Sequence, residues 1–420
     1  MIPSRLRFVN ADVRPLLATG GIGVYNCRIP FEMTVWIVNP FDNLPVEGYR
    51  PQRYWLMARA FARAGHAVTY WTSDFSHARK APRRFKDRPM ARPSGGAMSV
   101  DGFRLVLVPT RPYPYNICLR RVLSHRAFAR AWKRMAVESG ERPDVTIASL
   151  PPLSSCAAAL DLCRNTGARF VADVQDAWPE TFYRLAPRWL FAPLKAMAGR
   201  IYRSADAVTA VAQRYIDLAR SYGAAAPTHL CHLGIEIEKQ AARPAAPSKT
   251  FNLFYLGAMG KSYDLETVID AVKEMEDVEL DLAGTGPKEM ALRRRAADCP
   301  RIHFRGYLEK DATASIFRRA HAGVIPMFPD SCVGVPNKLA DYAAAGLRVV
   351  NSLPGETAQI LDKFGAGVSY EAGNMVSFIR AVRKLRQLDH AVPDGFRLLF
   401  DAERLYGGFV DFIEKKVSVK

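Results

Sequence analysis

Short apolar runs of strand length alternate with longer amphipathic segments from Met33 onward. Such runs, when turn residues bound them, are typical of strands that are buried on both faces. Their alternation with helical segments predicts parallel sheets that are covered by helices on both sides. In the first half of the chain the runs are residues 34–39, 67–72, 103–108, 144–149, 169–174, 207–212 and 228–233.

A second block of the same pattern follows residues 236–250, a polar segment rich in alanine and proline that is typical of a linker. The sequence therefore predicts an α/β protein with two doubly wound domains, residues 33–235 and 251–395. The apolar runs of the second block are residues 252–257, 278–284, 301–306, 321–326 and 347–351.

The two ends of the chain lie outside this pattern. Residues 1–32 show neither strand–helix order nor the compact apolar core of a signal peptide, so we expect an N-terminal extension. Translation could start at Met1 or at Met33. Residues 396–420 predict a C-terminal helical segment, which a Gly-Gly pair weakens. Its apolar positions are Leu405, Phe409 and Phe412.

Composition supports two domains and a reducing compartment. A chain of 420 residues with 49% hydrophobic content is too long for one ordinary core. Its seven cysteines include no CxxC pair, which argues against a disulfide framework and against a zinc cluster. No apolar run is long enough to span a bilayer. We therefore expect a cytoplasmic protein.

The positive charge is confined to the first half. The formal net charge is +18, and residues 251–420 carry 23 basic and 23 acidic residues, so the whole excess lies in residues 1–250. A nucleic-acid binder would carry basic residues on both domains, whereas basic segments with interleaved aromatic residues suit peripheral attachment to an anionic membrane. These segments are residues 79–92, residues 116–135, which include Val122, Leu123 and Trp132, and residues 180–203.

Glycine-containing loops follow the strands of the second domain, where parallel sheets bind their ligands. The loops contain Gly260 with Lys261, then Gly284, then Tyr307 after a further glycine. Glycine lets the backbone approach a phosphate, and lysine supplies positive charge. The spacing matches neither GxGxxG nor a Walker motif, and each loop alone could be a tight turn.

The segment "PNKLADYAAAG" has the signals of a short helix at a ligand site. Proline suits its start, Asn337 is a candidate cap, and a glycine ends it. The helix N-terminus and Lys338 would favour a diphosphate, and Asp341 could accept hydrogen bonds from a ribose diol. The alternative is an i,i+3 pair of Lys338 and Asp341 on a solvated face.

These motifs together resemble a known enzyme family. "YLGAMGKSYDLETVIDA", "LAGTGP", "IHFRGYLEKD" and "PNKLADYAAAGLRVV" resemble the sugar-nucleotide domain of GT-B glycosyltransferases in the large retaining family four, also called group 1. "AGHAVTYWTS", "DVQDAWPE" and "SADAVTAVA" resemble that family's acceptor domain. The resemblance implies the GT-B fold, in which two Rossmann-like domains face a cleft.

The resemblance also implies roles for the donor-side residues. Gly260, Lys261, Asn337 and Lys338 would hold the diphosphate, with Lys261 as an electrostatic catalyst. Members of the family often carry two glutamates separated by seven residues; here the first position is Val333 and the second is aspartate. Gly284 and Tyr307 are expected to border the base, and Asp341 is expected to bind the ribose. Recognition of the donor sugar would then depend on backbone amides near Gly334 and Val335.

On the acceptor side, a loop with Gly48 leads to Arg50 and Arg53, which would face the cleft. The two arginines either bind a phosphate or are solvated at a helix start. "DAWPE" places Asp176 near the acceptor hydroxyl as a catalytic group, with Trp178 beside it; the alternative is that Asp176 caps the next helix. No DxD motif suits a metal, and the acids of "EDVELDLAG" alternate on one exposed strand face, so we expect neither metal nor cofactor.

The expected function is transfer of a sugar from a UDP- or GDP-type donor to a hydroxyl of a polyprenyl-linked or other saccharide acceptor. Such an enzyme would act in the biosynthesis of lipopolysaccharide, another cell-surface polysaccharide or a glycolipid, on the inner face of the membrane and without nucleic acid. The alternatives are a sugar-nucleotide epimerase and a non-enzymatic basic protein that binds membranes or nucleic acid.

Overall fold

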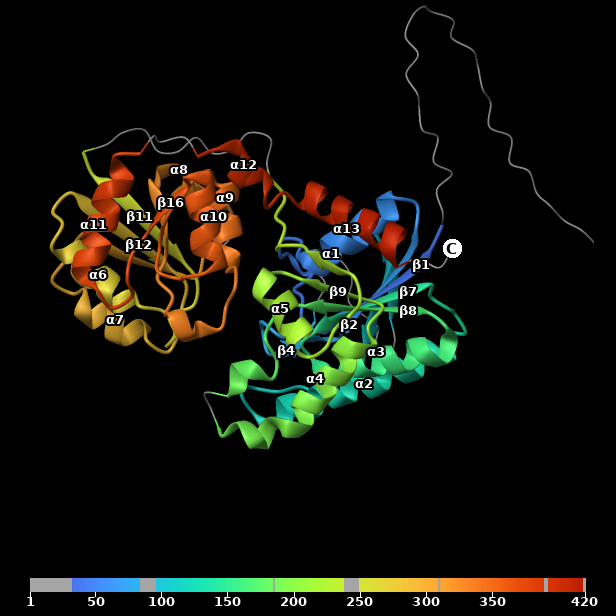
Figure 1. The fold of residues 1–420 in the computed structure, drawn as a ribbon. Helices are drawn as coiled ribbons and strands as arrows, with labels where there is room; N and C mark the ends of the chain where they lie inside the picture. Colours follow the sequence, from blue (N-terminus) through green and yellow to red (C-terminus); the bar gives the residue numbers. More distant parts are fainter. Residues whose placement is uncertain are drawn as a thin grey trace, which may run out of the picture. The chain divides into compact units, whose positions relative to one another are not determined.

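The structure is a computed structural model that describes residues 32–83, 96–183, 186–237, 249–308, 310–388 and 392–417. Within these residues two large sheets carry the fold (Figure 1). The first has the strand order β10-β9-β8-β7-β1-β2-β6-β5, and only β5 runs antiparallel to its neighbour. Its strands are β1 (Thr34–Val38), β2 (Ala67–Ser73), β5 (Ala97–Val100), β6 (Phe103–Val108), β7 (Val145–Leu150), β8 (Arg169–Val174), β9 (Ala207–Ala210) and β10 (Thr228–Leu230).

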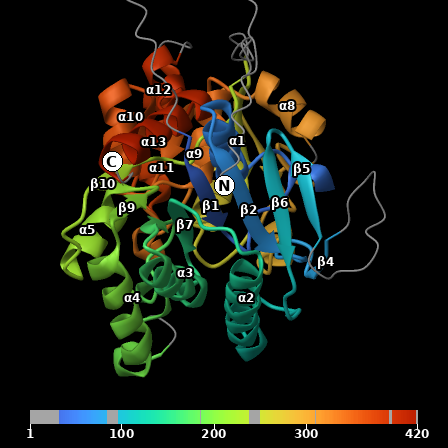
Figure 2. The same ribbon diagram turned by 90° about the vertical axis from the view of Figure 1, so that its right-hand side faces the viewer.

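Alternate residues of the first sheet enter two different cores. In β1, Val35 and Ile37 pack with α1 and α13, whereas Trp36 and Val38 pack with α2 and α3. Figure 2 shows β5 and β6 at one side of this sheet and β9 and β10 at the other. The helices of this part are α1 (Arg53–Arg63), α2 (Leu119–Glu138), α3 (Leu153–Thr166), α4 (Ala192–Ser204), α5 (Gln213–Ser221) and α13 (Ala402–Lys416), and a small hairpin pairs β3 (Phe75–Ser76) with β4 (Ala81–Pro82).

The second sheet is entirely parallel, in the order β13-β12-β11-β14-β15-β16. Its faces are again covered separately, because α6, α7 and α11 pack on one and α9 and α10 on the other. The strands are β11 (Phe251–Leu256), β12 (Val278–Ala283), β13 (Ile302–Gly306), β14 (Ala322–Ile325), β15 (Arg348–Asn351) and β16 (Gly367–Ser369). The helices are α6 (Leu265–Lys273), α7 (Glu289–Arg295), α8 (Lys310–Arg319), α9 (Asn337–Ala344), α10 (Glu356–Phe364), α11 (Met375–Arg386) and α12 (Asp394–Leu398).

The structure confirms every strand that the apolar runs predict. The elements that the sequence did not predict are β3, β4, β5 and β16, which are short and lie at sheet edges or in a separate hairpin. Edge strands need no continuous apolar run, because one side is open, and therefore give little signal. Among the described residues no helix is long and apolar enough to cross a membrane.

The C-terminal segment forms α13, which returns to the first sheet and packs against α1 (Figure 1). The helix runs through the Gly-Gly pair that was expected to weaken it. Phe409 is buried as predicted, but Leu405 and Phe412 lie only at the margin of the contact. Tyr406 and Ile413 are buried in place of the predicted Leu405 and Phe412, so the buried face is shifted by one residue along the helix. The buried residues of α13 are Ala402, Tyr406, Phe409, Val410 and Ile413.

Candidate functional site

A cavity of about 480 Å³ lies where the carboxyl ends of strands from both sheets face each other. Ligands of parallel α/β sheets bind at such ends. Seven of the residues singled out in the sequence line it: Arg50, Asp176, Val333, Val335, Asn337, Lys338 and Asp341. Its other lining residues are Gln175, Val211, Tyr215, Leu233, Leu256, Gly257, Tyr263, Met327 and Pro336.

Helix α9 points its N-terminus at this cavity, since Pro336, Asn337 and Lys338 all line it. Pro336 occupies the N-cap position and Asn337 is the first helical residue, exposed and without a side-chain cap. The expectation that Asn337 caps the helix is therefore wrong. The helix ends at Ala344, and Gly346 follows it as predicted, with a φ of 68° that glycine readily adopts.

Lys338 is a buried cation without an anionic partner. Its side chain is 8% exposed, and its ammonium lies 4.2 Å from the ring centre of Tyr263 and 5.1 Å from that of Tyr255. Among the described residues the ammonium donates no hydrogen bond and forms no ion pair. Burial lowers the pKa of Lys338 to about 8, although the charge of Asp341 acts in the opposite direction. The loop opposite leaves it room, because a Cβ at Gly257 would lie 2.6 Å from Nζ.

Asp341 forms an ion pair with Arg50, which links α9 to the loop before α1. The charge of Asp341 raises the pKa of Arg50 despite the opposing effect of burial. Asp341 is buried, whereas half of the Arg50 side chain remains exposed. The alternative of a solvated Lys338–Asp341 pair is therefore wrong, because both side chains are buried and Asp341 pairs with Arg50 instead.

Three glycines lie at the carboxyl ends of the adjacent strands β11, β12 and β13, where the loops approach one another closely. The amide of Gly257 donates to Ala283 at 2.9 Å, and the amide of Gly284 donates to Gly306 at 2.7 Å. A Cβ at Gly284 would lie 1.9 Å from the carbonyl oxygen of Gly257, and its φ of 122° also favours glycine. The packing of two loops is thus sufficient to explain Gly284.

Four of the expected donor residues do not line the cavity: Gly260, Lys261, Gly284 and Tyr307. Lys261 is exposed in the turn after β11, and Tyr307 is 73% exposed at the end of β13. Their roles toward a ligand stay predictions. Tyr263, whose ring lies against the Lys338 ammonium, was not predicted from the sequence, because one tyrosine in a loop carries no distinctive signal.

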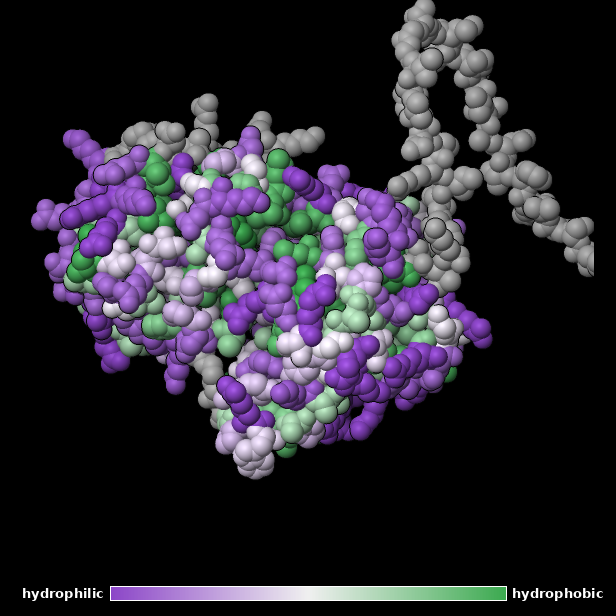
Figure 3. Space-filling view, in the orientation of Figure 1, coloured by the Kyte–Doolittle hydropathy of each residue, from purple (hydrophilic) through white to green (hydrophobic). Residues whose placement is uncertain are grey.

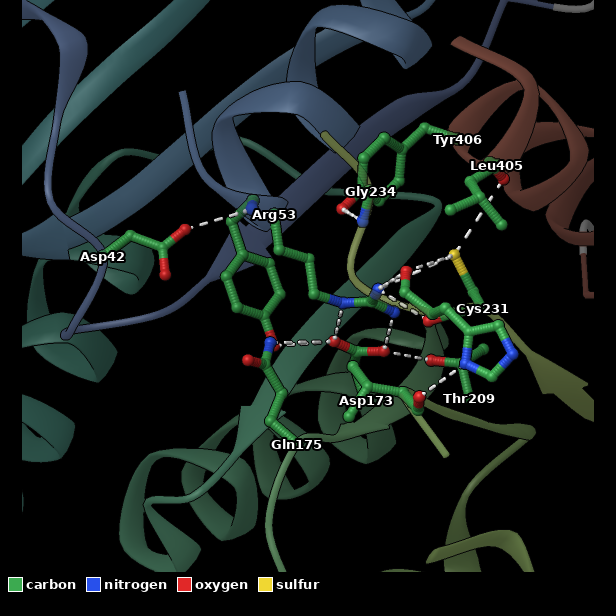
Figure 4. A network of polar contacts seen from close by, with 12 residues as sticks. Asp42, Arg53, Asp173, Gln175, Thr209, Cys231, Gly234, Leu405 and Tyr406 are labelled. Atoms are coloured by element: carbon green, nitrogen blue, oxygen red, sulfur yellow. Dashed lines mark hydrogen bonds and ion pairs between the residues drawn. The ribbon is translucent and has the colours of Figure 1, made fainter. Parts of the chain in front are cut away.

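Arg53 does not face the cavity, and its expected contact with an acceptor is wrong. Its guanidinium is buried and donates to both carboxylate oxygens of Asp173, at 2.8 and 2.7 Å, and to the carbonyl oxygen of Cys231 at 2.8 Å (Figure 4). The hydroxyls of Tyr54 and Thr209 donate to the same carboxylate. Although burial alone would raise it, the pKa of Asp173 is lowered by Arg53 and these hydrogen bonds.

Asp176 lies at the cavity and also stabilises its own loop. Its carboxylate accepts hydrogen bonds from the amide of Ala177 at 2.9 Å and from the hydroxyl of Thr181 at 3.1 Å. Burial raises the pKa of Asp176 in spite of these bonds. The carboxylate therefore both caps the following turn, as the alternative held, and remains available at the cavity wall.

Trp178 and Gly48 lie outside the cavity lining. The ring of Trp178 packs on that of Phe182, with 4.6 Å between the ring centres, and its centre lies 5.7 Å from the guanidinium carbon of Arg121. Gly48 ends a short 3₁₀-helix, Pro45–Glu47, with a φ of 90° and an amide that donates to Pro45 at 2.8 Å. A left-handed turn explains the glycine.

The loop that carries Val333 contacts the start of α5. Arg214 donates to the carbonyl oxygen of Val333 at 3.1 Å, and the hydroxyl of Tyr215 donates to that of Cys332 at 3.3 Å. A Cβ at Gly334 would lie 2.4 Å from that of Ala212, so the approach requires glycine. Val333 stands where relatives often have a glutamate, so the side chain that lines the cavity at this position is apolar.

No group of three or more His, Cys, Asp or Glu side chains in the described part of the chain is arranged to hold a metal ion. The expectation that the acids of β12 share an exposed face is wrong for Asp281, which is buried. Its carboxylate pairs with Arg305 and, at 2.9 Å, with Arg319. A buried strand position can hold an acid because two arginines compensate its charge.

Known structures share this architecture. A sucrose-phosphate synthase from Thermosynechococcus elongatus superposes with a TM-score of 0.71, 14% identity, and coverage of 91% of this chain and 99% of that one. The lipopolysaccharide outer core galactosyltransferase WaaB superposes with a TM-score of 0.62 and 14% identity, and the match covers 92% of this chain and 100% of that one. The Anabaena HepE protein in complex with UDP and glucose superposes with a TM-score of 0.63 and 12% identity, and the match covers 91% of this chain and 100% of that one. The curated protein sequences contain no match. The two facing parallel sheets are the GT-B fold.

Family models describe both parts of the chain. Residues 53–239 match the model for glycosyltransferase family 4, and residues 250–387 match that for glycosyl transferases group 1. The chain belongs to this family and is a glycosyltransferase. The epimerase and the non-enzymatic binder are therefore set aside as alternatives.

Proposed function

We propose that the protein transfers a glycosyl group from a nucleoside-diphosphate sugar to a hydroxyl of a lipid-linked saccharide, without a metal ion or cofactor. The observation that carries the donor class is Lys338, a buried cation without an anionic partner at the N-terminus of α9. A diphosphate supplies the missing anion and accepts hydrogen bonds from the amides at the start of the helix. The complex of the HepE protein with UDP supports a UDP-type donor.

In this proposal Lys338 acts mainly on the leaving group. Negative charge grows on the diphosphate as the glycosidic bond breaks, and fixed positive groups stabilise it there. Asp341 accepts hydrogen bonds from the ribose hydroxyls, which replace its ion pair with Arg50. Residues 251–395 form the donor-binding domain, and residues 33–235 form the acceptor-binding domain.

Asp176 is the candidate partner of the acceptor hydroxyl. It reaches the cavity from the sheet opposite α9, and its raised pKa makes the carboxylate a stronger proton acceptor than an exposed aspartate. The hydroxyl proton would pass to this carboxylate as the new glycosidic bond forms.

Replacement of Asp341 by alanine tests the donor site. We expect UDP to raise the melting temperature of the wild-type protein, and the variant to bind UDP about tenfold or more weakly, because hydrogen bonds to a charged group are lost. A thermal-shift panel of UDP, GDP and their sugars measures this. The matched control is Asp362→Ala, which removes an exposed acid of α10. Equal UDP affinity in the Asp341 variant and the control would contradict the assignment.

We further propose that the first domain lies against an anionic membrane. Large apolar side chains just before and at the start of α2 and in the 3₁₀-helix Arg188–Phe191 are between 39 and 74% exposed. The edge formed by this 3₁₀-helix and the start of α4 is pale rather than strongly hydrophilic in Figure 3. Basic residues surround the apolar ones on α2. The exposed apolar residues are Tyr115, Ile117, Leu119, Val122, Leu123, Trp189 and Leu190.

Part of the sequence-based membrane prediction needs correction. Trp132 belongs to the core, not to the surface. Arg83 is buried and pairs with Glu47, to which Arg79 also donates. Residues 84–92 of the most basic segment lie outside the described residues.

Co-sedimentation with vesicles of phosphatidylglycerol and phosphatidylcholine tests the membrane face. We expect the double variant Ile117→Ser/Leu119→Ser to lose most of the vesicle-bound fraction, because each exposed apolar side chain contributes to interfacial binding. The control is Met290→Ser/Val376→Ser, which changes equally exposed apolar residues of the second domain. If both double variants bind vesicles like the wild type, this face does not contact the membrane.

A further inference from the structure

A second cationic cluster lies in the first domain and takes no part in the donor site. Its centre is Arg121 of α2, whose guanidinium lies 5.4, 6.0 and 5.7 Å from the ring centres of Phe41, Tyr113 and Trp178. It donates to the carbonyl oxygen of Asn116 at 2.6 Å. Its Nε also donates to Nε2 of His125 at 3.3 Å. Three aromatic faces, one carbonyl and one imidazole thus hold the guanidinium in place.

Lys80 brings a second positive charge to the same place. Its ammonium lies 5.0 Å from the ring centre of Tyr113 and donates to the side chain of Asn116 at 2.5 Å. It also donates to the carbonyl oxygen of His77 at 2.6 Å. The two cations therefore share Tyr113 and Asn116 as neighbours.

Neither cation forms an ion pair with a carboxylate in the part of the chain that the structure describes. Burial lowers the pKa of Arg121, and the charge of Asp176 acts in the opposite direction without a direct ion pair between the two side chains. Burial, and then the charge of Arg121, lower the pKa of Lys80 to about 8. Burial, Lys80 and Arg121 lower the pKa of His77 to about 3, and burial and Arg121 lower the pKa of His125 to about 3, so both imidazoles are neutral at pH 7.

The cluster lies at the ligand-binding edge of the first sheet. Phe41 follows β1, Lys80 lies in the hairpin after β2, Tyr113 follows β6, and Trp178 follows β8. All four strands are parallel neighbours or near neighbours in the sheet, so their carboxyl ends meet. Asp176, two residues before Trp178, connects this edge with the cavity that receives the donor.

We propose that Lys80 and Arg121 bind a phosphate or diphosphate group of the acceptor, and that this group positions the acceptor hydroxyl at Asp176. Two cations without a counter-ion repel each other, and an anion between them removes this repulsion. Arginine with its planar fork and lysine as a compact charge are both suited to phosphate oxygens. The apolar residues at the start of α2 would lie beside the lipid chain that carries the phosphate. The inference rests on the proposed function, since it names a part of its acceptor.

Titration with inorganic pyrophosphate in the presence of saturating UDP tests the proposal, because UDP blocks the donor site. We expect the wild-type protein to bind pyrophosphate and Arg121→Gln and Lys80→Gln each to bind it about tenfold or more weakly, as charge-assisted hydrogen bonds are lost. The matched control is Arg120→Gln, which changes an exposed arginine of the same helix and should bind like the wild type. UDP affinity, measured in each variant, shows that the fold and the donor site are intact.

Farnesyl diphosphate and farnesol identify the source of the phosphate. An acceptor site predicts that the diphosphate binds the wild-type protein more tightly than the alcohol and that Arg121→Gln removes the difference. Pyrophosphate affinity that is equal in Arg121→Gln, Lys80→Gln and Arg120→Gln would overturn the inference while leaving the donor site unaffected. Failure of UDP to bind the wild-type protein would instead contradict the proposed function, and the same three variants would then be compared without UDP.

Discussion

Replacement of Lys338 by methionine is expected to lower UDP affinity about tenfold to a hundredfold and the rate of glycosyl transfer by a further factor of about 10². The reason is that methionine keeps the length and packing of the side chain between Gly257 and Tyr263 but removes the charge opposite the diphosphate. Calorimetric titration with UDP and a donor-turnover assay measure the two effects. The control is Lys363→Met, at an exposed position of α10, which should change neither.

The pH dependence of donor binding provides an independent check on the same residue. The free protein holds the pKa of Lys338 at about 8, chiefly through burial, and a bound diphosphate raises it. Above pH 8 binding must therefore take up a proton, so UDP affinity should fall as the pH rises past 8 and stay level below it. The fall should be absent in Lys338→Met. A wild-type affinity that is constant from pH 7 to about pH 9.5 would show that this ammonium does not contact the nucleotide.

Replacement of Arg53 by leucine is expected to cost about 3–5 kcal/mol of unfolding free energy. The change leaves the carboxylate of Asp173 buried without its ion pair, with the hydroxyls of Tyr54 and Thr209 and the amide of Gln175 as its remaining side-chain donors. Urea denaturation followed by circular dichroism measures the shift. The control is Arg59→Leu on the same helix, where the partner is the half-exposed Glu236 and the expected cost is about 1 kcal/mol or less. Similar losses for the two variants would contradict the structural role of Arg53.

The fold was predictable because buried parallel strands carry their signal in the local sequence. The continuous apolar runs of β1, β7 or β11 have no other simple interpretation, and their alternation with helices restricts the topology. Helix α9 was predictable for a similar reason, since proline, glycine and the short alanine run mark its limits. The register of α13 was not, because its partner α1 lies far away in the sequence.

The site was predictable where a residue follows a strand or begins a helix, and not where its partner is distant. Arg50 and Arg53 look alike in the sequence, yet one pairs with Asp341 at the cavity and the other with Asp173 in the core. The difference arises because Arg50 lies in the loop before α1, whereas Arg53 is the first residue of that helix and contacts a carboxylate on β8. Likewise, nothing local to Arg121 indicates that three rings from separate loops surround it.

The central claim is that the cavity at α9 binds the diphosphate and ribose of the donor. The most direct measurement is a crystal structure of the protein with UDP. The account predicts diphosphate oxygens within hydrogen-bond distance of the Lys338 ammonium and ribose hydroxyls on the Asp341 carboxylate, with Arg50 displaced from it. A UDP molecule that is bound elsewhere, or that leaves Lys338 without a phosphate and the Arg50–Asp341 ion pair intact, would contradict it.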